Sequence, residues 1–180
     1  GQTWVGFSDI RQADLGYDDG PKAEARLAFI RGDRSREEDG YRKRASRLGS
    51  IVNSSPEYVG APDAGWPDSA PFGESSKRYS AFVSAQAGRT PTVYVGSNDG
   101  MLHGFKATED GGNEVLAYIP EFVYSSEQYQ GLHYLTDPQY QHRYYVDLSL
   151  RQQDVYTKGR TSNGGVSAER DWRTILIGGG

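Results

Sequence analysis

The sequence of 180 residues contains no cysteine and no apolar run long enough to cross a bilayer. The missing thiols exclude disulfides, thiolate catalysis and cysteine-ligated metals. Lysine and arginine total 20 against 24 aspartate and glutamate, and the two signs are interspersed, so the net charge is only −4. A nucleic-acid partner or an anionic membrane requires a basic footprint that this composition does not indicate. We therefore expect no nucleic-acid partner and no membrane insertion.

Sequence signatures of the common catalytic classes are absent as well. There is no nucleophile elbow, no phosphate-binding glycine loop and no evident pair of catalytic carboxylates. The three histidines, His103, His133 and His142, lie far apart and do not show the H-x-x-x-H or H-E-x-x-H spacing of metal ligands. The sequence therefore predicts a protein that acts by binding and is not an enzyme.

Tyrosine and glycine are abundant, with 13 and 23 residues, and this balance favours strands and turns over packed helices. The clearest element is the stretch 92–105, TVYVGSNDGMLHGF, where apolar residues flank Asn98, Asp99 and Gly100. This pattern predicts a hairpin of two short strands whose turn ends in Gly100 at positive φ. Turn chemistry accounts for all three turn residues, so we do not interpret them as ligands.

The first 49 residues predict an irregular region with short helices. An early proline followed by good helix formers indicates a helix over 21–30. A second short helix is predicted near 41–47. The dense charges of 31–47 are expected to face solvent.

From residue 50 onward the pattern changes to strands. Short strands are predicted near 51–52, again at 57–59 after a polar turn with Pro56, and over 114–120, whereas the apolar stretch 79–86 is ambiguous. Because a single hairpin cannot bury its faces, the hairpin at 92–105 predicts neighbours of the same kind. The sequence therefore predicts an all-β fold with minor helical segments.

A weak internal repeat links these strands. Residues 51–54 followed by 93–96 are echoed by 145–148 followed by 175–178. Radial repetition of strand units with insertions of unequal length produces such an echo, and two unrelated strand pairs in a sandwich are the alternative. A closed ring needs several blades of about 40 to 45 residues each. We therefore expect the chain to hold only the first blades of a ring that is truncated at its C-terminal end.

Several segments follow one another in an order that resembles a known family. Segment 31–35 reads RGDRS, segment 44–56 reads RASRLGSIVNSSP, the hairpin 93–105 comes next, and segment 172–180 reads WRTILIGGG. Together they resemble the C-terminal β-propeller of PilC/PilY-type type IV pilus tip adhesins. The hairpin alone is typical of many quinoprotein-like propellers, whereas the two upstream segments are typical of the pilus family.

The resemblance implies a fold, a role and a location. The fold would be a partial β-propeller with quinoprotein-like blades of antiparallel strands, in which 1–49 form the irregular N-terminal region and 50–180 the first blades. The protein would be exported to the pilus tip or the outer surface of a bacterium, where it engages minor pilins and a host integrin or another surface receptor. Its expected roles are pilus biogenesis, twitching motility and calcium-dependent adhesion. The alternative is the propeller of a quinone-dependent (PQQ-type) dehydrogenase, which shares the blade motif but needs its own cofactor.

Arg31, Gly32 and Asp33 are the candidate adhesion residues. An integrin-type contact needs an exposed turn in which glycine lets the chain fold back while a cation and a carboxylate project apart. The carboxylate then completes the metal shell of the partner. The same residues also fit a helix C-terminus, where Gly32 ends the helix and Asp33 turns back onto backbone amides. We keep both interpretations.

Asp14, Asp18 and Asp19 are the candidate calcium ligands. They lie on the glycine-containing loop 14–20, and calcium takes about six to eight oxygen ligands, which such a loop can supply in part. The loop lacks the regular D-x-[DN]-x-[DN]-G alternation, so the motif is incomplete. Calcium is the one cofactor that we expect.

Overall fold

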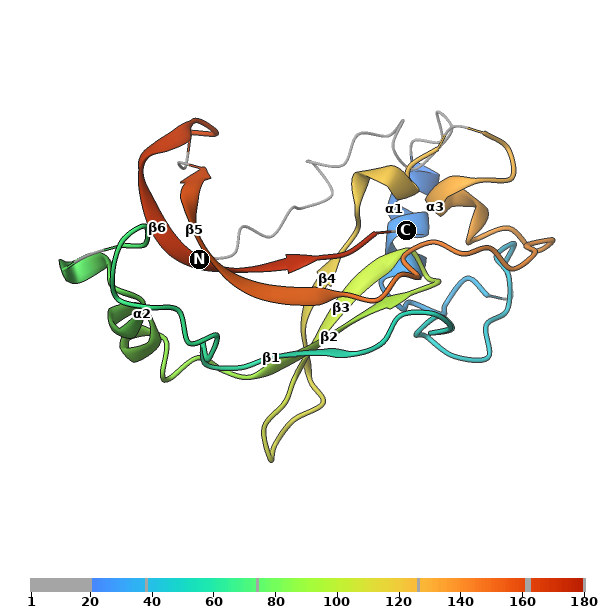
Figure 1. Cartoon of the computed structure of the whole chain (residues 1–180). Coiled ribbons are helices and arrows are strands. Elements are labelled where there is room, and N and C mark those ends of the chain that lie inside the picture. The colour runs from blue at the N-terminus through green and yellow to red at the C-terminus, as the bar shows by residue number, and fades with distance from the viewer. Residues whose placement is uncertain (1–20, 38, 74, 126, 161–162, 180) are drawn as a thin grey trace.

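The computed structural model describes residues 21–179 apart from residues 38, 74, 126, 161 and 162 (Figure 1). Strands dominate this part of the chain, and its helices are short. The elements in chain order are α1 (Pro21–Ile30), β1 (Glu57–Val59), the 3₁₀ turn η3 (Ser75–Lys77), α2 (Tyr79–Ala85), β2 (Thr92–Ser97), β3 (Met101–Lys106), β4 (Glu114–Tyr118), the 3₁₀ turn η4 (Glu121–Val123), α3 (Gly131–Tyr134), β5 (Arg151–Arg160) and β6 (Val166–Ile177). The expected all-β class with minor helical segments is confirmed.

The strands β1 to β4 form one antiparallel sheet whose spatial order is the chain order. Strands β2 and β3 pair from Thr92 opposite Lys106 to Ser97 opposite Met101. Gly100 in their connecting turn has a φ of 91°, so the hairpin predicted from the sequence is confirmed. A four-stranded antiparallel sheet in this order is the unit from which propeller blades are built.

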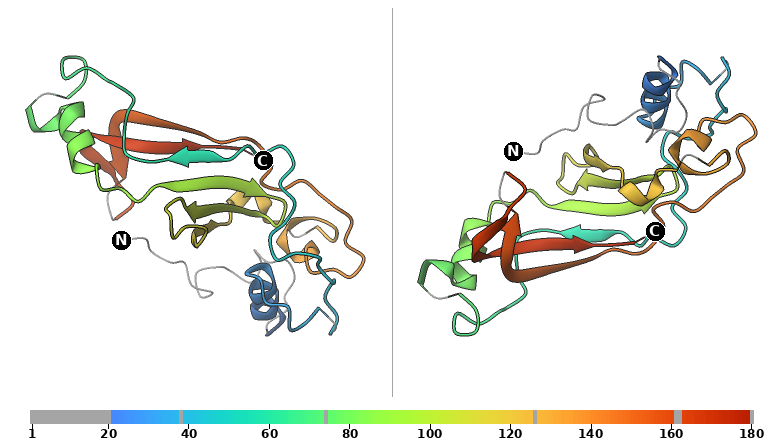
Figure 2. Two further views of the ribbon diagram at one scale, coloured as in Figure 1. Left: turned by 90° about the horizontal axis from the view of Figure 1, so that it is seen from below. Right: turned by 90° about the horizontal axis from the view of Figure 1, so that it is seen from above.

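The strands β5 and β6 form a second sheet, a long hairpin. They pair from Arg151 opposite Ile177 to Arg160 opposite Val166. Figure 1 shows the far end of this hairpin curling back, and Figure 2 shows the hairpin running beside β1. Strand β1 contacts β5, so the second sheet lies against the first strand of the first sheet.

An aromatic cluster packs beneath this curved hairpin. Its centre is Trp172 of β6, which is 4% exposed. Five other rings surround it: Trp66, Phe72, Tyr79, Phe82 and Tyr156. Burial of aromatic rings supplies much of the free energy that holds loops to a sheet, so this cluster fixes the excursion between β1 and β2 onto β6.

The main hydrophobic core lies at the turn end of the β2–β3 hairpin. It joins α1 to β3, to α3 and to the segments that flank α3, and its buried members are Leu27, Ile30, Met101, Val123, Leu132, Leu135, Tyr145 and Val146. Full burial of an aliphatic side chain of this size contributes about 1.5–3 kcal/mol. The helix α1 is therefore anchored to the sheet through Leu27 and Ile30.

The predicted helix over 21–30 is confirmed as α1, but the second one, over 41–47, is wrong. These residues are extended and bent. The side chain of Arg42 donates to the carbonyl oxygen of Leu135, and Arg44 donates to that of Phe29. Because both side chains are held by distant parts of the fold, tertiary contacts override the helix propensity of this segment.

The predicted strands at 51–52 and 145–148 are also wrong. In both segments a side chain accepts the hydrogen bond of a backbone N–H that would otherwise pair with a neighbouring strand. The N–H of Asn53 donates to Asp147, and the N–H of Tyr145 donates to Asn98. The internal repeat therefore fails at two of its four positions. The predicted strand over 114–120 is confirmed as β4, and the ambiguous stretch 79–86 forms α2.

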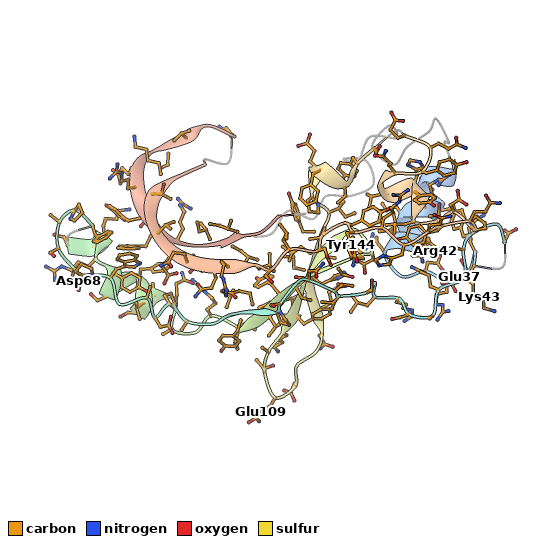
Figure 3. The ribbon with its side chains drawn as sticks, turned by 45° about the vertical axis from the view of Figure 1, so that its right-hand side comes forward. Glu37, Arg42, Lys43, Asp68, Glu109 and Tyr144 are labelled. Atoms are coloured by element: carbon orange, nitrogen blue, oxygen red, sulfur yellow. The ribbon has the colours of Figure 1, made fainter. Side chains whose placement is uncertain are left out.

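Charged side chains are distributed over the whole length of the molecule. Figure 3 shows Glu37, Arg42 and Lys43 at the end that carries α1, Asp68 at the opposite end, and Glu109 on the loop between β3 and β4. None of the helices among the described residues is both long and apolar enough to cross a membrane.

Candidate functional site

The Arg31-Gly32-Asp33 tripeptide forms the C-terminal cap of α1. Gly32 has a φ of 103°, which glycine adopts without steric cost. Its N–H donates to the carbonyl oxygen of Phe29 at 2.9 Å, and the N–H of Asp33 donates to that of Ala28 at 2.9 Å. These two bonds are the pair that defines a Schellman motif. The capping interpretation of Gly32 is therefore correct.

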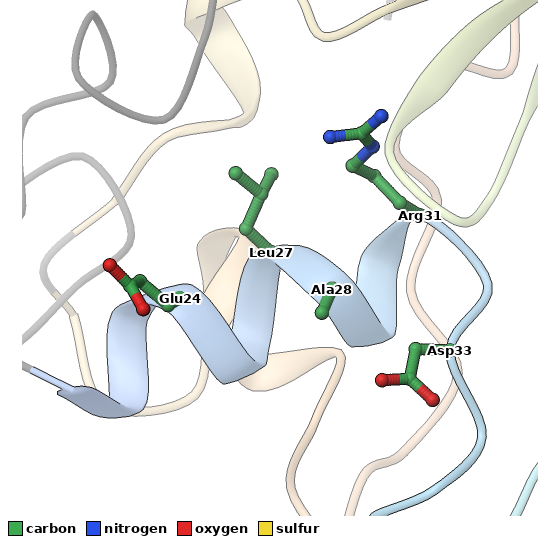
Figure 4. Close-up of a pocket in the computed structure, with 5 residues that line it drawn as sticks. All are labelled: Glu24, Leu27, Ala28, Arg31 and Asp33. Atoms are coloured by element: carbon green, nitrogen blue, oxygen red, sulfur yellow. The ribbon is translucent and has the colours of Figure 1, made fainter.

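The cap also leaves the two charged side chains at the surface. Arg31 and Asp33 are both exposed, and Figure 4 shows them projecting on different sides of the helix end. They border a shallow hollow of about 460 Å³ whose other lining residues are Glu24, Leu27 and Ala28. The turn therefore caps α1 and also leaves both charged side chains exposed, as an adhesion contact would require.

Local hydrogen bonding orients the carboxylate of Asp33. The backbone N–H of Ser35 donates to Asp33 Oδ1 at 2.8 Å. This bond, helped by the side chain of Ser35 and by nearby arginines, holds the pKa of Asp33 below its ordinary value. The carboxylate is therefore ionised at neutral pH, and one of its oxygens accepts a hydrogen bond from the backbone of the same turn.

Arg44 locks the backbone of this turn from beneath. Its Nη1 donates to the carbonyl oxygen of Phe29 at 2.7 Å and its Nη2 to that of Asp33 at 2.8 Å. Its Nε donates to Glu37 at 2.8 Å, and Glu37 also accepts from Arg34 at 3.0 Å. One buried guanidinium thus ties the helix end and the following loop into a rigid unit.

The ion pairs fix the charge state of Glu37. Burial alone raises the pKa of this carboxyl, but the hydrogen bonds from Arg44 and Arg34 outweigh burial and lower the pKa to about 2. Glu37 is therefore charged over the whole physiological pH range. Its role is to hold Arg44 in place and, through Arg44, the exposed turn.

The candidate calcium residues Asp14, Asp18 and Asp19 lie outside the described residues. Within the described part of the chain, no group of three or more histidine, aspartate and glutamate side chains is arranged to hold a metal ion. Calcium binding at the loop 14–20 therefore stays a prediction.

The turn of the β2–β3 hairpin also makes contacts with distant parts of the chain, which the sequence does not predict. Asp99 accepts the N–H of Gly49 at 2.8 Å and contacts Nε2 of His103 at 3.1 Å. The other ring nitrogen of His103 contacts Glu114 of β4 at 2.5 Å. The turn therefore binds the segment after α1 to the sheet, through partners that no local motif reveals because Gly49 lies 50 residues from Asp99.

Two opposing effects set the charge of His103. Burial lowers the pKa of its imidazole, but the hydrogen bonds and charges of Asp99 and Glu114 outweigh burial, so the pKa lies above its ordinary value of 6.5. An imidazole held between two carboxylates in this way is a structural linker when protonated.

These features define a class of protein: a β-sheet scaffold of propeller type, on which a rigid turn presents one cation and one carboxylate. The comparison with known families is more specific. The sequence model of the PilY1 beta-propeller domain matches residues 48–178, and the chain belongs to this family. The tripeptide Arg31-Gly32-Asp33 lies before the matched segment.

Individual relatives agree with this assignment. Type IV pilus biogenesis factor PilY1 of Pseudomonas aeruginosa strain PAK is 41% identical over 98% of this chain and 14% of its own length. The protein of the same name from strain PAO1 is 40% identical over the same shares. A PilY1 homolog of Xylella fastidiosa strain Temecula1 is 38% identical over 96% of this chain and 13% of its own length. The chain thus spans about one seventh of these relatives. No solved structure matches.

Proposed function

We propose that the chain is part of a type IV pilus biogenesis factor that acts by binding at the pilus tip on the outer surface of a bacterium. The observation that carries this proposal is the 41% identity, over 98% of the chain, to a relative named as such a factor. The proposal includes the roles expected from the sequence, namely pilus assembly, twitching motility and adhesion, with minor pilins and a surface receptor as partners.

The mechanism that we propose is presentation by a rigid scaffold. Paired strands and the Arg44 contacts hold the turn at Arg31 and Asp33 in a fixed geometry, which lowers the entropy lost when a partner binds. The carboxylate of Asp33 would complete the metal shell of an integrin-type receptor, and the guanidinium of Arg31 would meet an acidic side chain. Calcium at Asp14, Asp18 and Asp19 would add to the adhesive function.

The pilus role is tested in a bacterium that carries the gene. Deleting the segment that encodes this chain should abolish surface pili and twitching zones, and a plasmid copy of the full gene should restore both. Normal piliation after the deletion would contradict the proposal. Reduction of a redox dye by the purified chain, with a quinone cofactor and an alcohol or sugar, would favour the dehydrogenase alternative instead.

The adhesion role is tested by removing one carboxylate. Asp33→Asn keeps an oxygen that can accept from Ser35 but loses the charge, so binding to integrin-bearing cells should fall while piliation is retained. The matched control is Asp39→Asn, which changes an exposed carboxylate in the same loop. Equal adhesion of both variants and of the unchanged protein would overturn the assignment of Asp33.

Calcium binding is tested by calorimetric titration of the chain and of Asp18→Ala. Binding that is weakened by the substitution supports a site at loop 14–20. Absence of binding, or equal binding by both proteins, would remove calcium from the proposal.

A further inference from the structure

Two cations face each other near the far end of the β5–β6 hairpin, and we call them the cation pair. Lys158 of β5 lies opposite Arg170 of β6 in the register of the two strands, and both residues are exposed. Directly opposite residues of an antiparallel pair point to the same face, with their Cβ atoms about 4.5–5.5 Å apart. Because like charges at this spacing repel each other, the pair weakens the hairpin that carries it.

Neighbouring carboxylates do not compensate the cation pair. Glu169 and Asp171 flank Arg170 in β6, but successive side chains of a strand point to opposite faces. Both carboxylates lie beside Lys77 of η3, whose Nζ is 3.9 Å from Glu169 and 3.2 Å from Asp171. Within the described part of the chain, no ion pair or side-chain hydrogen bond joins Lys158 or Arg170 to another group. Their charges therefore attract anions, in a protein whose net charge is −4.

The backbone beneath the cation pair is anchored by the neighbouring residue pair. Tyr156 and Trp172 lie opposite each other, two residues away from the cation pair along each strand and on the same face. Their ring centres are 5.3 Å apart, and Trp172 is the buried centre of the aromatic cluster. The spacing of the two cations is therefore set before a partner arrives, which lowers the entropy lost on binding.

The opposite face of the hairpin differs in its charge. Arg173 lies opposite Val155, so its side chain is on the other face from the cation pair. A Cβ at Gly159 would lie 2.2 Å from Cζ of Arg173, so this guanidinium lies against the backbone of β5. Among the described side chains at this end of the hairpin, the face of Arg173 thus presents one cation. The face of the cation pair presents two at a defined spacing.

We infer that the cation pair binds an acidic helix of a partner protein. Small-molecule sites are concave, whereas these side chains stand on exposed strands, as in a contact with a macromolecule. Two carboxylates at helix positions i and i+4 have Cβ atoms about 5–6 Å apart, which matches the spacing of opposite residues in the hairpin. One carboxylate would accept from the ammonium of Lys158 and the other from the guanidinium of Arg170. The inference rests on the hairpin and not on the pilus role, so either can fail without the other.

The test uses three alanine-based peptides of about 20 residues, long enough for a helix to form in water. The first carries glutamates at positions i and i+4, the second carries them at i and i+2, which do not share a helix face, and the third carries glutamines at i and i+4. Backbone amide shifts of the chain, followed by NMR at about 10 mM ionic strength, measure weak binding and locate it. We expect the first peptide to shift residues 157–159 and 169–171, and to bind at least about tenfold more tightly than the third and about threefold more tightly than the second. These differences should shrink at about 150 mM, where the Debye length is about 8 Å.

Charge reversal separates binding from folding. Lys158→Glu places a carboxylate opposite Arg170, so the melting temperature should stay the same or rise, while binding of the first peptide weakens at least about tenfold. Arg170→Glu should act in the same way. The matched control is Arg173→Glu, which reverses an exposed arginine of the same strand on the other face and should weaken binding by no more than about twofold at about 150 mM ionic strength. Circular dichroism checks that the variants are folded, and Arg170→Gln decides the question if a reversed variant is not.

Several outcomes would overturn the inference. Absence of binding by the first peptide, or equal binding of the first and second, would remove the match in spacing. Equal loss in Arg170→Glu and Arg173→Glu would show non-specific attraction to positive charge. A heparin oligosaccharide that shifts the same amides when the first peptide does not would replace the acidic helix by an anionic glycan.

Discussion

The guanidinium carbon of Arg44 lies 3.6 Å from the centre of the Phe29 ring. The same guanidinium donates to the carbonyl oxygens of Phe29 and Asp33. A cation stacked on an aromatic face and saturated with acceptors has little freedom to move. The buried side chain of Arg44 therefore fixes the conformation of the exposed turn at Arg31 and Asp33.

Replacing Arg44 by lysine should therefore destabilise the protein. A lysine keeps the charge but lacks the planar fork that serves three acceptors at once. Loss of the two charge-assisted bonds to the carbonyl oxygens is expected to lower the free energy of unfolding by about 3 kcal/mol. Urea denaturation followed by tryptophan fluorescence measures the change.

The control for this experiment is Arg36→Lys. Arg36 is exposed and contacts only the exposed Asp39 among the ion pairs of the described residues, so its replacement should change stability by no more than about 0.5 kcal/mol. If both lysine variants unfold at the same urea concentration, Arg44 is not the anchor of the turn.

Glu37 should make the stability of the folded protein depend on pH in the acidic range. Its pKa is lowered from an ordinary value of 4.5 to about 2, so the unfolded chain takes up a proton before the folded one does. The stabilisation is present above pH 4.5 and is lost as the pH falls toward 2. The melting temperature of the unchanged protein should exceed that of Glu37→Gln at pH 6, and this gap should narrow at pH 3. Other carboxyls with lowered pKa values are present in both proteins and cancel in the comparison, so a gap that is constant with pH would contradict the assignment.

Local signals in the sequence are sufficient to predict some of the helices and strands but not others. The hairpin at 92–105 and the helix at 21–30 were predicted because turn residues, strand formers and an early proline act within a few positions. The strand expected at 145–148 fails because Asn98, 47 residues away, captures the N–H of Tyr145. Such partners have no local signature, so no periodicity reveals them.

The sequence does not predict the full length of the β5–β6 hairpin, and here the reason is the residue pattern of the strand itself. Strand β6 spans Val166–Ile177 and reads VSAERDWRTILI, in which charged residues interrupt the alternation that marks a half-buried strand. Likewise the motif in the sequence reveals the candidate tripeptide Arg31-Gly32-Asp33. Arg44 and Glu37, which hold its backbone, belong to a charged loop that the sequence predicts only to face solvent. Their burial follows from tertiary packing around α1.

Gly100 should resist substitution more than Gly112 does. Both have positive φ, 91° and 89°, so alanine at either position costs about 1–2 kcal/mol of backbone strain. A Cβ at Gly100 would lie 2.6 Å from Cδ2 of the fully buried Leu132, whereas a Cβ at Gly112 would meet nothing within 4 Å. The clash should add about 1–3 kcal/mol to Gly100→Ala. Equal urea midpoints for the two variants would show that the core yields at Leu132 without cost.

His103 should titrate above its ordinary pKa of 6.5, because the carboxylates of Asp99 and Glu114 favour its charged form more than burial disfavours it. The raised pKa contributes stability that is fully present below pH 6.5 and is lost as the pH rises through the folded-state pKa. Following the imidazole carbon-bound protons by NMR against pH measures this pKa directly. Glu114→Gln removes one of the two carboxylates and should lower the pKa of His103, whereas Glu109→Gln, on the loop before β4, should leave it unchanged. A pKa of His103 at or below 6.5 in the unchanged protein would mean that burial dominates, and the histidine would then be a neutral packing residue instead of a charged link between the hairpin turn and β4.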